Sequence, residues 1–317
     1  MLKTEQSTDE IKRRRTGIYS GLLASFLLGW APILGKLAYR AGVDSITLAA
    51  LRTVVAALLL LTGYLIFWRK QLLIKWPALL GCLLVGSING IGSIFYYNGL
   101  VRLDAAPASL LSTLYAVWVV IFLAASGQKI TRLTLLRLGV SLVGAFFVTA
   151  PWGAANPADY LGIMLMIASA AINGWYIVMG QWVLSDVPAG SATLYIITGM
   201  ALTVSLAWGI NTGGELPIIS RSGWLTIVAL GCTTVAARLA MFFSMERLGG
   251  VQTVILNLME MVISLALAML LLRETLSGLQ WIGALLMLVS VFLARYDMRR
   301  GGAPPPAFNP MSERGSE

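Results

Sequence analysis

The sequence predicts an all-α integral membrane protein, with ten transmembrane helices arranged as two inverted-topology repeats of five helices each. Three observations support this fold class. The 317 residues are 58% hydrophobic and only 12% charged, with a mean hydropathy of +0.81, a composition far from that of a soluble domain. Apolar runs long enough to cross a bilayer recur along the chain. A shift of 145 residues aligns motifs of the first half with motifs of the second.

The apolar runs are separated by short charged or Gly/Pro-rich breaks, so each run reads as one helix. A transmembrane helix needs about 20 mostly apolar residues. The predicted spans are residues 17–38, 46–67, 78–99, 106–126, 133–150, 159–182, 190–210, 224–244, 251–271 and 278–295. Because the links are short, we expect a compact helical bundle with almost nothing left over for a soluble domain.

The two ends of the chain are predicted to lie outside this bundle. Residues 1–16 form a basic amino terminus with KRRR at 12–15. The apolar run that follows lacks a clean A-x-A cleavage site and precedes further spans, so we interpret it as an uncleaved first helix. Residues 301–317, GGAPPPAFNPMSERGSE, have the composition of a disordered tail. The first repeat is therefore predicted over 17–150 and the second over 159–296.

The distribution of Lys and Arg predicts the orientation of the chain. With a cytoplasmic amino terminus, the cytoplasmic segments next to spans hold fourteen basic residues. The opposite side holds only Arg40, Arg102, Arg221 and Arg273. Cytoplasmic loops carry the excess of positive charge. We therefore expect a multi-pass protein of the cell (inner) membrane with both termini in the cytoplasm.

The internal repeat is seen in three separated places at one offset. The shift of 145 residues places GWAPILGK at 29–36 on GWYIVMGQ at 174–181, Gly86 on Gly231, and the Arg-Leu pair at 102–103 on that at 247–248. The shift spans five predicted helices, an odd number, so the second half enters the membrane inverted. Secondary transporters with inverted repeats bind substrate near the midplane, between the halves.

Four charged residues within the predicted spans are the leading site candidates. They are Lys36, Arg52 and Arg238, together with Glu260, the one clearly intramembrane acid. Such charges are costly in a bilayer and usually face the protein interior. Arg238 and Glu260 are expected at similar depth on neighbouring helices. Either they only neutralise each other, or a substrate carboxylate or a proton competes for one partner.

The excess of intramembrane cations over anions has two interpretations. Three cations to one anion favour an anionic or carboxylate-bearing solute, provided that all three basic residues line the cavity. Lys36 and Arg52 are expected near the outer membrane surface, however. They could instead reach water along their apolar stems or pair with Asp44.

Uncharged residues supply a second group of candidates for substrate binding or coupling. Asn257 lies three residues before Glu260 and shares its helical face. The others are Asn89, Asn173, Tyr115, and the repeat-related pair Trp30 and Trp175. Tyr115 is the residue that the 145-residue shift places on Glu260. Each of these side chains could instead connect helices by hydrogen bonds or serve packing.

Pro32 is expected to distinguish the first helix from its counterpart in the second half. Proline removes a helical hydrogen bond and can kink a transmembrane helix, which exposes backbone carbonyls to a cavity. The position related to Pro32 by the shift is Ile177, which has no such effect.

Several classes of function are disfavoured by composition. The chain has no histidine, and its two cysteines lie in separate predicted spans without CxxC spacing, so we expect no metal site and no cofactor. It has no GxSxG, no carboxylate pair and no Walker A motif, so an enzyme is not expected. The net charge of +9 reflects the cytoplasmic loops and not a nucleic-acid partner.

The motifs around Arg52 and Glu260 resemble those of the drug/metabolite transporter superfamily, in its EamA-like branch. They are TLAALRTVVAALLL, which contains Arg52, and RLGGVQTVILNLMEMVISLALAMLLLRETLS, which contains Glu260 and the RET triplet at 273–275. The resemblance covers roughly residues 17–296. Two departures weaken a symmetric two-carboxylate scheme: residues 128–129 are Gln-Lys where the family usually has an acid, and position 115 is tyrosine.

The resemblance implies secondary active transport of small metabolites, often export of amino acids or related compounds, without a fixed cofactor. The leading hypothesis is a transporter, expected to be an exporter, of a small carboxylate-bearing metabolite, with Arg238 as the anchor and Glu260 as its charge partner or proton acceptor. The alternative is a multidrug exporter of organic cations that uses Glu260. The expected partners are the small-molecule substrate and the lipid bilayer, with the chain acting as a monomer or homodimer.

Overall fold

The computed structural model describes residues 2–72, 74–127, 132–149, 159–183, 187, 189–248, 256 and 259–300. All regular elements in these residues are helical. In the first half they are α1 (Leu2–Gly29), α2 (Ala31–Arg40), α3 (Ser45–Phe67), the short η1 (Arg69–Leu72), α4 (Trp76–Arg102), α5 (Ala105–Ser112), α6 (Tyr115–Ala125) and α7 (Arg132–Thr149). In the second half they are α8 (Tyr160–Val183), α9 (Ala189–Thr212), α10 (Arg221–Leu248), α12 (Met259–Leu267), the π-helical turn η3 (Ala268–Leu272) and α13 (Gly278–Arg300).

Seven helical stretches in the described residues are long and apolar enough to cross a membrane. They coincide with the predicted spans one to four and six to eight. Three shorter apolar helices, Leu138–Thr149, Met259–Leu272 and Gly278–Ser290, coincide with the predicted fifth, ninth and tenth spans. The structure thus directly supports seven of the ten predicted crossings.

Two of the predicted spans are not continuous helices. The first is interrupted at Trp30, between α1 and α2, because Pro32 in the first turn of α2 has no N–H to continue the α1 ladder. The fourth is interrupted at Thr113–Leu114, between α5 and α6. There the hydroxyls of Ser112 and Thr113 donate to carbonyls three residues earlier, at 2.7 Å each. Such local bonds compete with the regular helical pattern.

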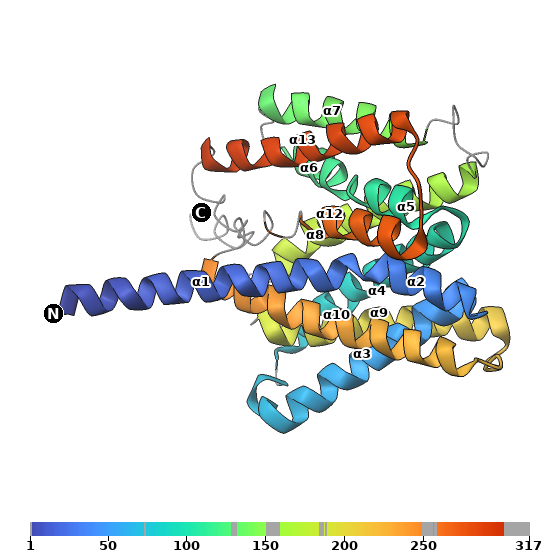
Figure 1. Ribbon diagram of the computed structural model, residues 1–317. Helices are drawn as coiled ribbons and strands as arrows, with labels where there is room; N and C mark the ends of the chain where they lie inside the picture. Colours follow the sequence, from blue (N-terminus) through green and yellow to red (C-terminus); the bar gives the residue numbers. More distant parts are fainter. Residues whose placement is uncertain are drawn as a thin grey trace, which may run out of the picture.

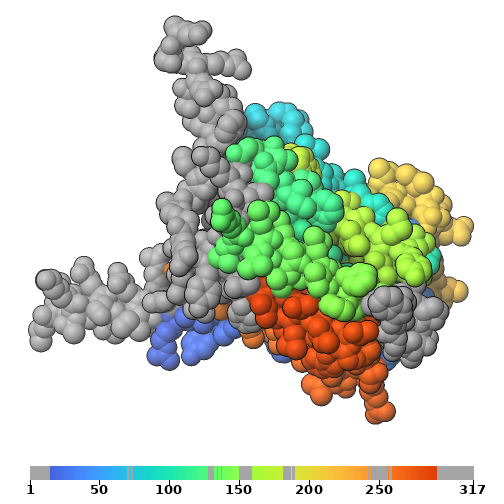
Figure 2. Space-filling view, turned by 90° about the horizontal axis from the view of Figure 1, so that it is seen from above, coloured from blue at the N-terminus to red at the C-terminus, as the bar shows by residue number. Residues whose placement is uncertain are grey.

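The two halves pack against each other in a reciprocal way. Helix α4 of the first half lies against α8 and α9, whereas α10 of the second half lies against α1, α2 and α3. Helices α7 and α13 form a separate pair (Figure 1). Seen from above, α7 and α13 lie side by side over one face of the molecule (Figure 2).

Glycine contacts support the 145-residue register at the level of atoms. A Cβ on Gly29 would lie 3.2 Å from the backbone oxygen of Glu260 and 2.7 Å from Ile263. A Cβ on Gly174 would lie 3.0 Å from the backbone oxygen of Tyr115 and 2.8 Å from Trp118. Each contact in the first pair maps onto its counterpart in the second after a shift of 145 residues. Both halves therefore have a glycine at this position, where the neighbouring helix comes too close for a side chain.

The first helices of the two halves run in opposite directions. Tyr39, near the end of α2, donates a hydrogen bond to the carbonyl of Tyr97, near the end of α4. The last residue of α4, Arg102, forms an ion pair with Asp159, just before α8, at 3.0 Å. The end of α2 and the start of α8 thus lie at the same end of the bundle. An inverted repeat requires this arrangement.

Candidate functional site

A cavity lies between the broken helices, bounded by segments of both halves. Its empty volume is about 540 Å³, including its opening. The first half contributes residues from α2, α4, α5 and the start of α6, and the second half contributes residues from α12. The lining residues are Pro32, Tyr96, Ser109, Ser112, Thr113, Tyr115, Ala116, Glu260, Met261 and Ser264. The cavity is therefore rich in hydroxyl groups and has two tyrosine rings.

Glu260 is the one charged residue among those that line this cavity. It lies on α12. Tyr115, its repeat-related partner, begins α6 on the other side of the cavity. The two positions related by the 145-residue shift therefore line the same cavity, one with a carboxylate and the other with a phenol. The arrangement can accept hydrogen bonds from, and neutralise, a cationic group.

Arg238 does not line this cavity, and the salt bridge considered for it is not formed. In the described residues, no ion pair joins Arg238 to Glu260 within 4.0 Å, although the two charges interact at longer range. In the described residues, α1 packs against both α10 and α12 (Figure 1).

Arg52 is buried, with 8% of its surface exposed. Its Nη2 donates to the hydroxyl of Ser93 at 2.7 Å, its guanidinium lies 4.7 Å from the centre of the Tyr97 ring, and its Nε has no hydrogen-bond partner. The alternatives of a solvent-reaching side chain or a link to Asp44 are therefore wrong for Arg52. The carboxylate of Asp44 instead caps α3 by accepting the N–H of Thr47 at 2.9 Å.

Lys36 lies half-buried on α2, near the carboxylates of Asp104 and Glu274. Glu274 accepts the backbone N–H groups of Ala105 and Ala106, both at 2.8 Å. It therefore caps the N-terminus of α5 from the second half of the chain. Burial raises the pKa of the Glu274 carboxyl, while the two N–H groups and Lys36 oppose this effect.

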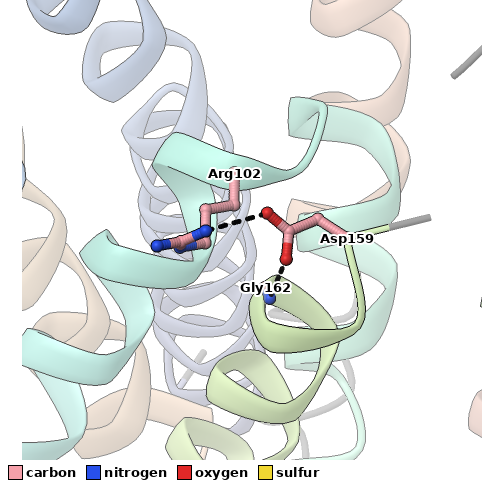
Figure 3. Close-up of polar contacts among 3 residues, drawn as sticks. All are labelled: Arg102, Asp159 and Gly162. Carbon is pink, nitrogen blue, oxygen red and sulfur yellow. Dashed lines mark hydrogen bonds and ion pairs between the residues drawn. The ribbon is translucent and has the colours of Figure 1, made fainter. Parts of the chain in front are cut away.

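The ion pair between Arg102 and Asp159 (Figure 3) is accessible to solvent, and neither residue is among those that line the cavity. Asp159 also accepts the N–H of Gly162 at 3.0 Å, which caps the start of α8. These hydrogen bonds, first the one from Gly162 and then the one from Arg102, lower the pKa of the Asp159 carboxyl. This pair fastens the first half to the second at the chain's midpoint.

The remaining predicted residues are dispersed. Asn89 contacts the sulfur of Met200 on α9 at 3.6 Å, and Asn173 is half-buried on α8. Trp30 forms an edge-on contact with Phe26, and Trp175, which is 37% exposed, forms one with Phe122. None of these four lines the cavity. Asn257 lies outside the described residues, as do the predicted tail 301–317 and residues 128–131.

Sequence reasoning missed most of the hydroxyl groups of the site. Ser109 and Ser264 were not singled out, although both line the cavity. Serine in a transmembrane helix gives little signal, because it commonly bonds to its own backbone. For Glu274, the RET triplet was noted, but its partner on α5 lies 168 residues away. Besides the charge of Glu260 and the proline at 32, the 145-residue shift pointed to one more residue of the lining, Tyr115.

Comparison with known proteins supplies a family and a fold. The model described as the EamA-like transporter family matches residues 15–150 and again residues 160–296. No curated protein matches the chain. Among solved structures, one described as "Crystal structure of protein" is 20% identical, with a TM-score of 0.64; the match covers 92% of this chain and 100% of that one. At this identity the likeness shows the fold alone.

Proposed function

Because this chain belongs to the EamA-like transporter family, it is a multi-pass membrane transporter, and we propose that it moves a small amine-bearing solute by secondary active transport. The observation that carries the proposal is the cavity around Glu260. Among the described residues, a single carboxylate, several hydroxyls and two tyrosine rings line it, and none of these lining residues is basic. Carboxylates and aromatic faces both attract ammonium groups.

The two halves provide a means of alternating access. The cavity has walls from both halves, and the first helices of the halves run in opposite directions. Rocking of one half against the other around a fixed site is the common cycle of transporters with inverted repeats. We therefore propose ten crossings, cytoplasmic termini, and export across the inner membrane, with Glu260 binding either the amine or a proton.

A second candidate keeps the carboxylate-bearing metabolite as the solute, and Arg52 favours it. A buried guanidinium whose Nε has no partner is costly unless an anionic group compensates it. Tyr96 of the cavity wall lies within electrostatic range of both Arg52 and Glu260. An amino acid would present its ammonium to Glu260 and its carboxylate towards Arg52.

Transport measurements distinguish the two candidates. First, metabolites retained and released by cells with and without the protein identify solutes. Uptake of these solutes into vesicles is then measured for the wild type and for Glu260→Gln, Arg52→Gln and Arg238→Ala. An amine transporter loses activity with Glu260→Gln and keeps it with Arg238→Ala. Loss of activity with Arg52→Gln only for carboxylate-bearing solutes supports the second candidate. Unchanged transport by Glu260→Gln contradicts both.

A further inference from the structure

We propose that the contact of α5 with α12 and η3 is a gate that closes one end of the Glu260 cavity and separates in each transport cycle. The inference rests on the proposed function in taking this cavity as the transport site. Three layers of contacts carry it, and they follow one another along antiparallel segments. Ser109 meets Ser264 next to the cavity, an apolar cluster follows, and Glu274 meets the start of α5.

The layer next to the cavity is a contact between two hydroxyls. The Oγ atoms of Ser109 and Ser264 lie 2.6 Å apart, and both side chains are buried. Ser109 also donates to the carbonyl of Ala105 at 2.7 Å, so Ser264 can donate to Ser109. Both residues line the cavity, and they therefore mark its end on this side.

The second layer is apolar and joins three segments. Ile33 of α2, Ala105 and Ala106 of α5, and Leu265 and Leu272 of the α12–η3 segment are buried together in one cluster. Their exposed fractions do not exceed 9%. None of these residues lines the cavity. Solute cannot pass between α5 and α12 while this cluster remains packed.

The outermost layer is the Glu274 cap on α5. Its two carboxylate oxygens accept the N–H groups of Ala105 and Ala106 at 2.8 Å each. These donors otherwise have no partner within the helix, and the start of a helix favours an anion. Lys36 of α2 and Asp104, just before α5, are charged groups near Glu274. The cap thus connects the second half to the first outside the apolar layer.

The backbone before Glu274 has the geometry that directs it towards α5. Residues 268–272 form a π-helical turn, and Arg273 has φ of 57°, the only left-handed non-glycine among the described residues. A left-handed residue other than glycine costs about 1–2 kcal/mol, and π-helical turns often occur at functional sites. The strained turn reverses the chain at this point. Glu274 follows this turn directly and makes its two contacts with α5.

The sequence has no carboxylate at the repeat-related position. The 145-residue shift places Glu274 on Lys129, a cation that cannot accept N–H groups. The two ends of the transporter are therefore chemically different, and the Glu274 gate belongs to one of them. By the distribution of basic residues, that end faces the exterior.

Reversible cross-linking tests the gate. In a background with Cys82→Ser and Cys232→Ser, the pair Ser109→Cys and Ser264→Cys is oxidised to a disulfide, for which the contact provides suitable proximity. We expect oxidation to stop transport of a solute found by the cell comparison, and reduction to restore it. The matched control is Ser45→Cys with Asn98→Cys, whose side chains lie 2.7 Å apart on α3 and α4 of one half; its oxidation leaves transport unchanged.

The rate of cross-linking gives a second measurement that needs no transport. With Glu274→Ala added, we expect the Ser109→Cys/Ser264→Cys disulfide to form about fivefold more slowly, the effect of losing roughly 1 kcal/mol of hydrogen bonding. With Glu274→Gln, which keeps one acceptor, the rate falls less. The control pair keeps its rate in both variants.

Three outcomes overturn the gate: no disulfide forms between positions 109 and 264, transport continues through the oxidised protein, or Glu274→Ala leaves the rate unchanged. The first and third outcomes need no transport measurement and are therefore independent of the proposed function. Failure of that function appears as unchanged transport by Glu260→Gln, which leaves the cross-linking rates as they are.

Discussion

The two halves of the transporter share a scaffold and differ in chemistry. Gly29 and Gly174 occupy equivalent places. Each lies against the backbone of a cavity-lining residue of the other half, Gly29 against Glu260 and Gly174 against Tyr115. At those cavity positions, however, the second half has Glu260 and the first half has Tyr115. The glycines permit close helix approach in both halves, while the charge occurs in only one.

A second difference concerns the helices that open each half. The first is broken at Trp30 before Pro32, whereas its counterpart α8 is continuous from Tyr160 to Val183 and carries Ile177 at the equivalent place. A broken helix brings Pro32 into the cavity wall. The two halves therefore share the close helix packing at their glycines. The cavity depends on the positions at which the two halves differ.

Moving the acid between the halves is expected to have the largest effect. Glu260→Tyr should reduce transport at least about tenfold, because one charge interaction with a cationic substrate is worth over 1 kcal/mol in a low-dielectric site. Adding Tyr115→Glu places a carboxylate at the repeat-related position and should recover part of the rate. The control is Tyr115→Phe with Glu260→Tyr. Equal rates for the two double variants, measured in vesicles, would show that the positions are not equivalent.

Adding a methyl group to the shared glycines should reduce stability in both halves alike. Gly29→Ala and Gly174→Ala each place a Cβ within 3.0 Å of a neighbouring side chain. Overpacking of this kind typically costs about 1–3 kcal/mol. Gly63→Ala is the matched control, since nothing lies within 4 Å of its Cβ. Melting temperatures in detergent measure the effect, and a loss confined to one glycine would contradict a shared scaffold.

Removing the helix break should slow transport by a smaller factor. Pro32→Ala restores an N–H that can continue the ladder of α1, so the first helix becomes more like α8. We expect a few-fold decrease in rate, with folding retained, because straightening moves one wall of the cavity and precise placement of a site matters for rate. Ile177→Ala in α8 serves as the control. A rate unaffected by Pro32→Ala would show that this asymmetry has no part in transport.

The surface connection between the halves should contribute least. The Arg102–Asp159 pair is exposed, and surface pairs contribute little. Because the pKa of Asp159 is lowered in the folded protein, its contribution is complete above the ordinary carboxyl value of 3.8 and is lost as the pH falls through the lower folded value. Asp159→Asn should therefore lower the melting temperature slightly at neutral pH, and less so in acid. If Asp159→Asn lowered the melting temperature more in acid than at neutral pH, this explanation would be contradicted.

The fold was largely predictable from the sequence, since hydropathy and the 145-residue shift depend only on local composition and order. Two predicted spans are divided in the structure, one at Trp30 and one at Thr113. Only the first break was indicated by the sequence, through Pro32. The packing of α1 against both α10 and α12 could not be predicted, because helix neighbours depend on packing across the whole bundle. The absence of Arg238 from the cavity lining in the described residues therefore had no signal in the sequence.

The candidate site was predicted only where charge marked it. Glu260 stood out because a carboxylate is rare in a bilayer, and Tyr115 because it corresponds to Glu260. The serines of α5 and α12 gave no comparable signal, although they line the cavity and join the halves. The role of Glu274 depends on two backbone N–H groups, which have no signature in the side-chain sequence.

The central claim is that Glu260 is the charge that binds the amine of the solute. It is tested most directly by equilibrium binding of a transported amine to the purified protein, for the wild type, Glu260→Gln and Arg238→Ala. The account predicts that Glu260→Gln weakens binding at least about tenfold, or roughly 1.4 kcal/mol, while Arg238→Ala retains wild-type affinity. Unchanged binding by Glu260→Gln, or loss of binding by Arg238→Ala alone, would contradict it.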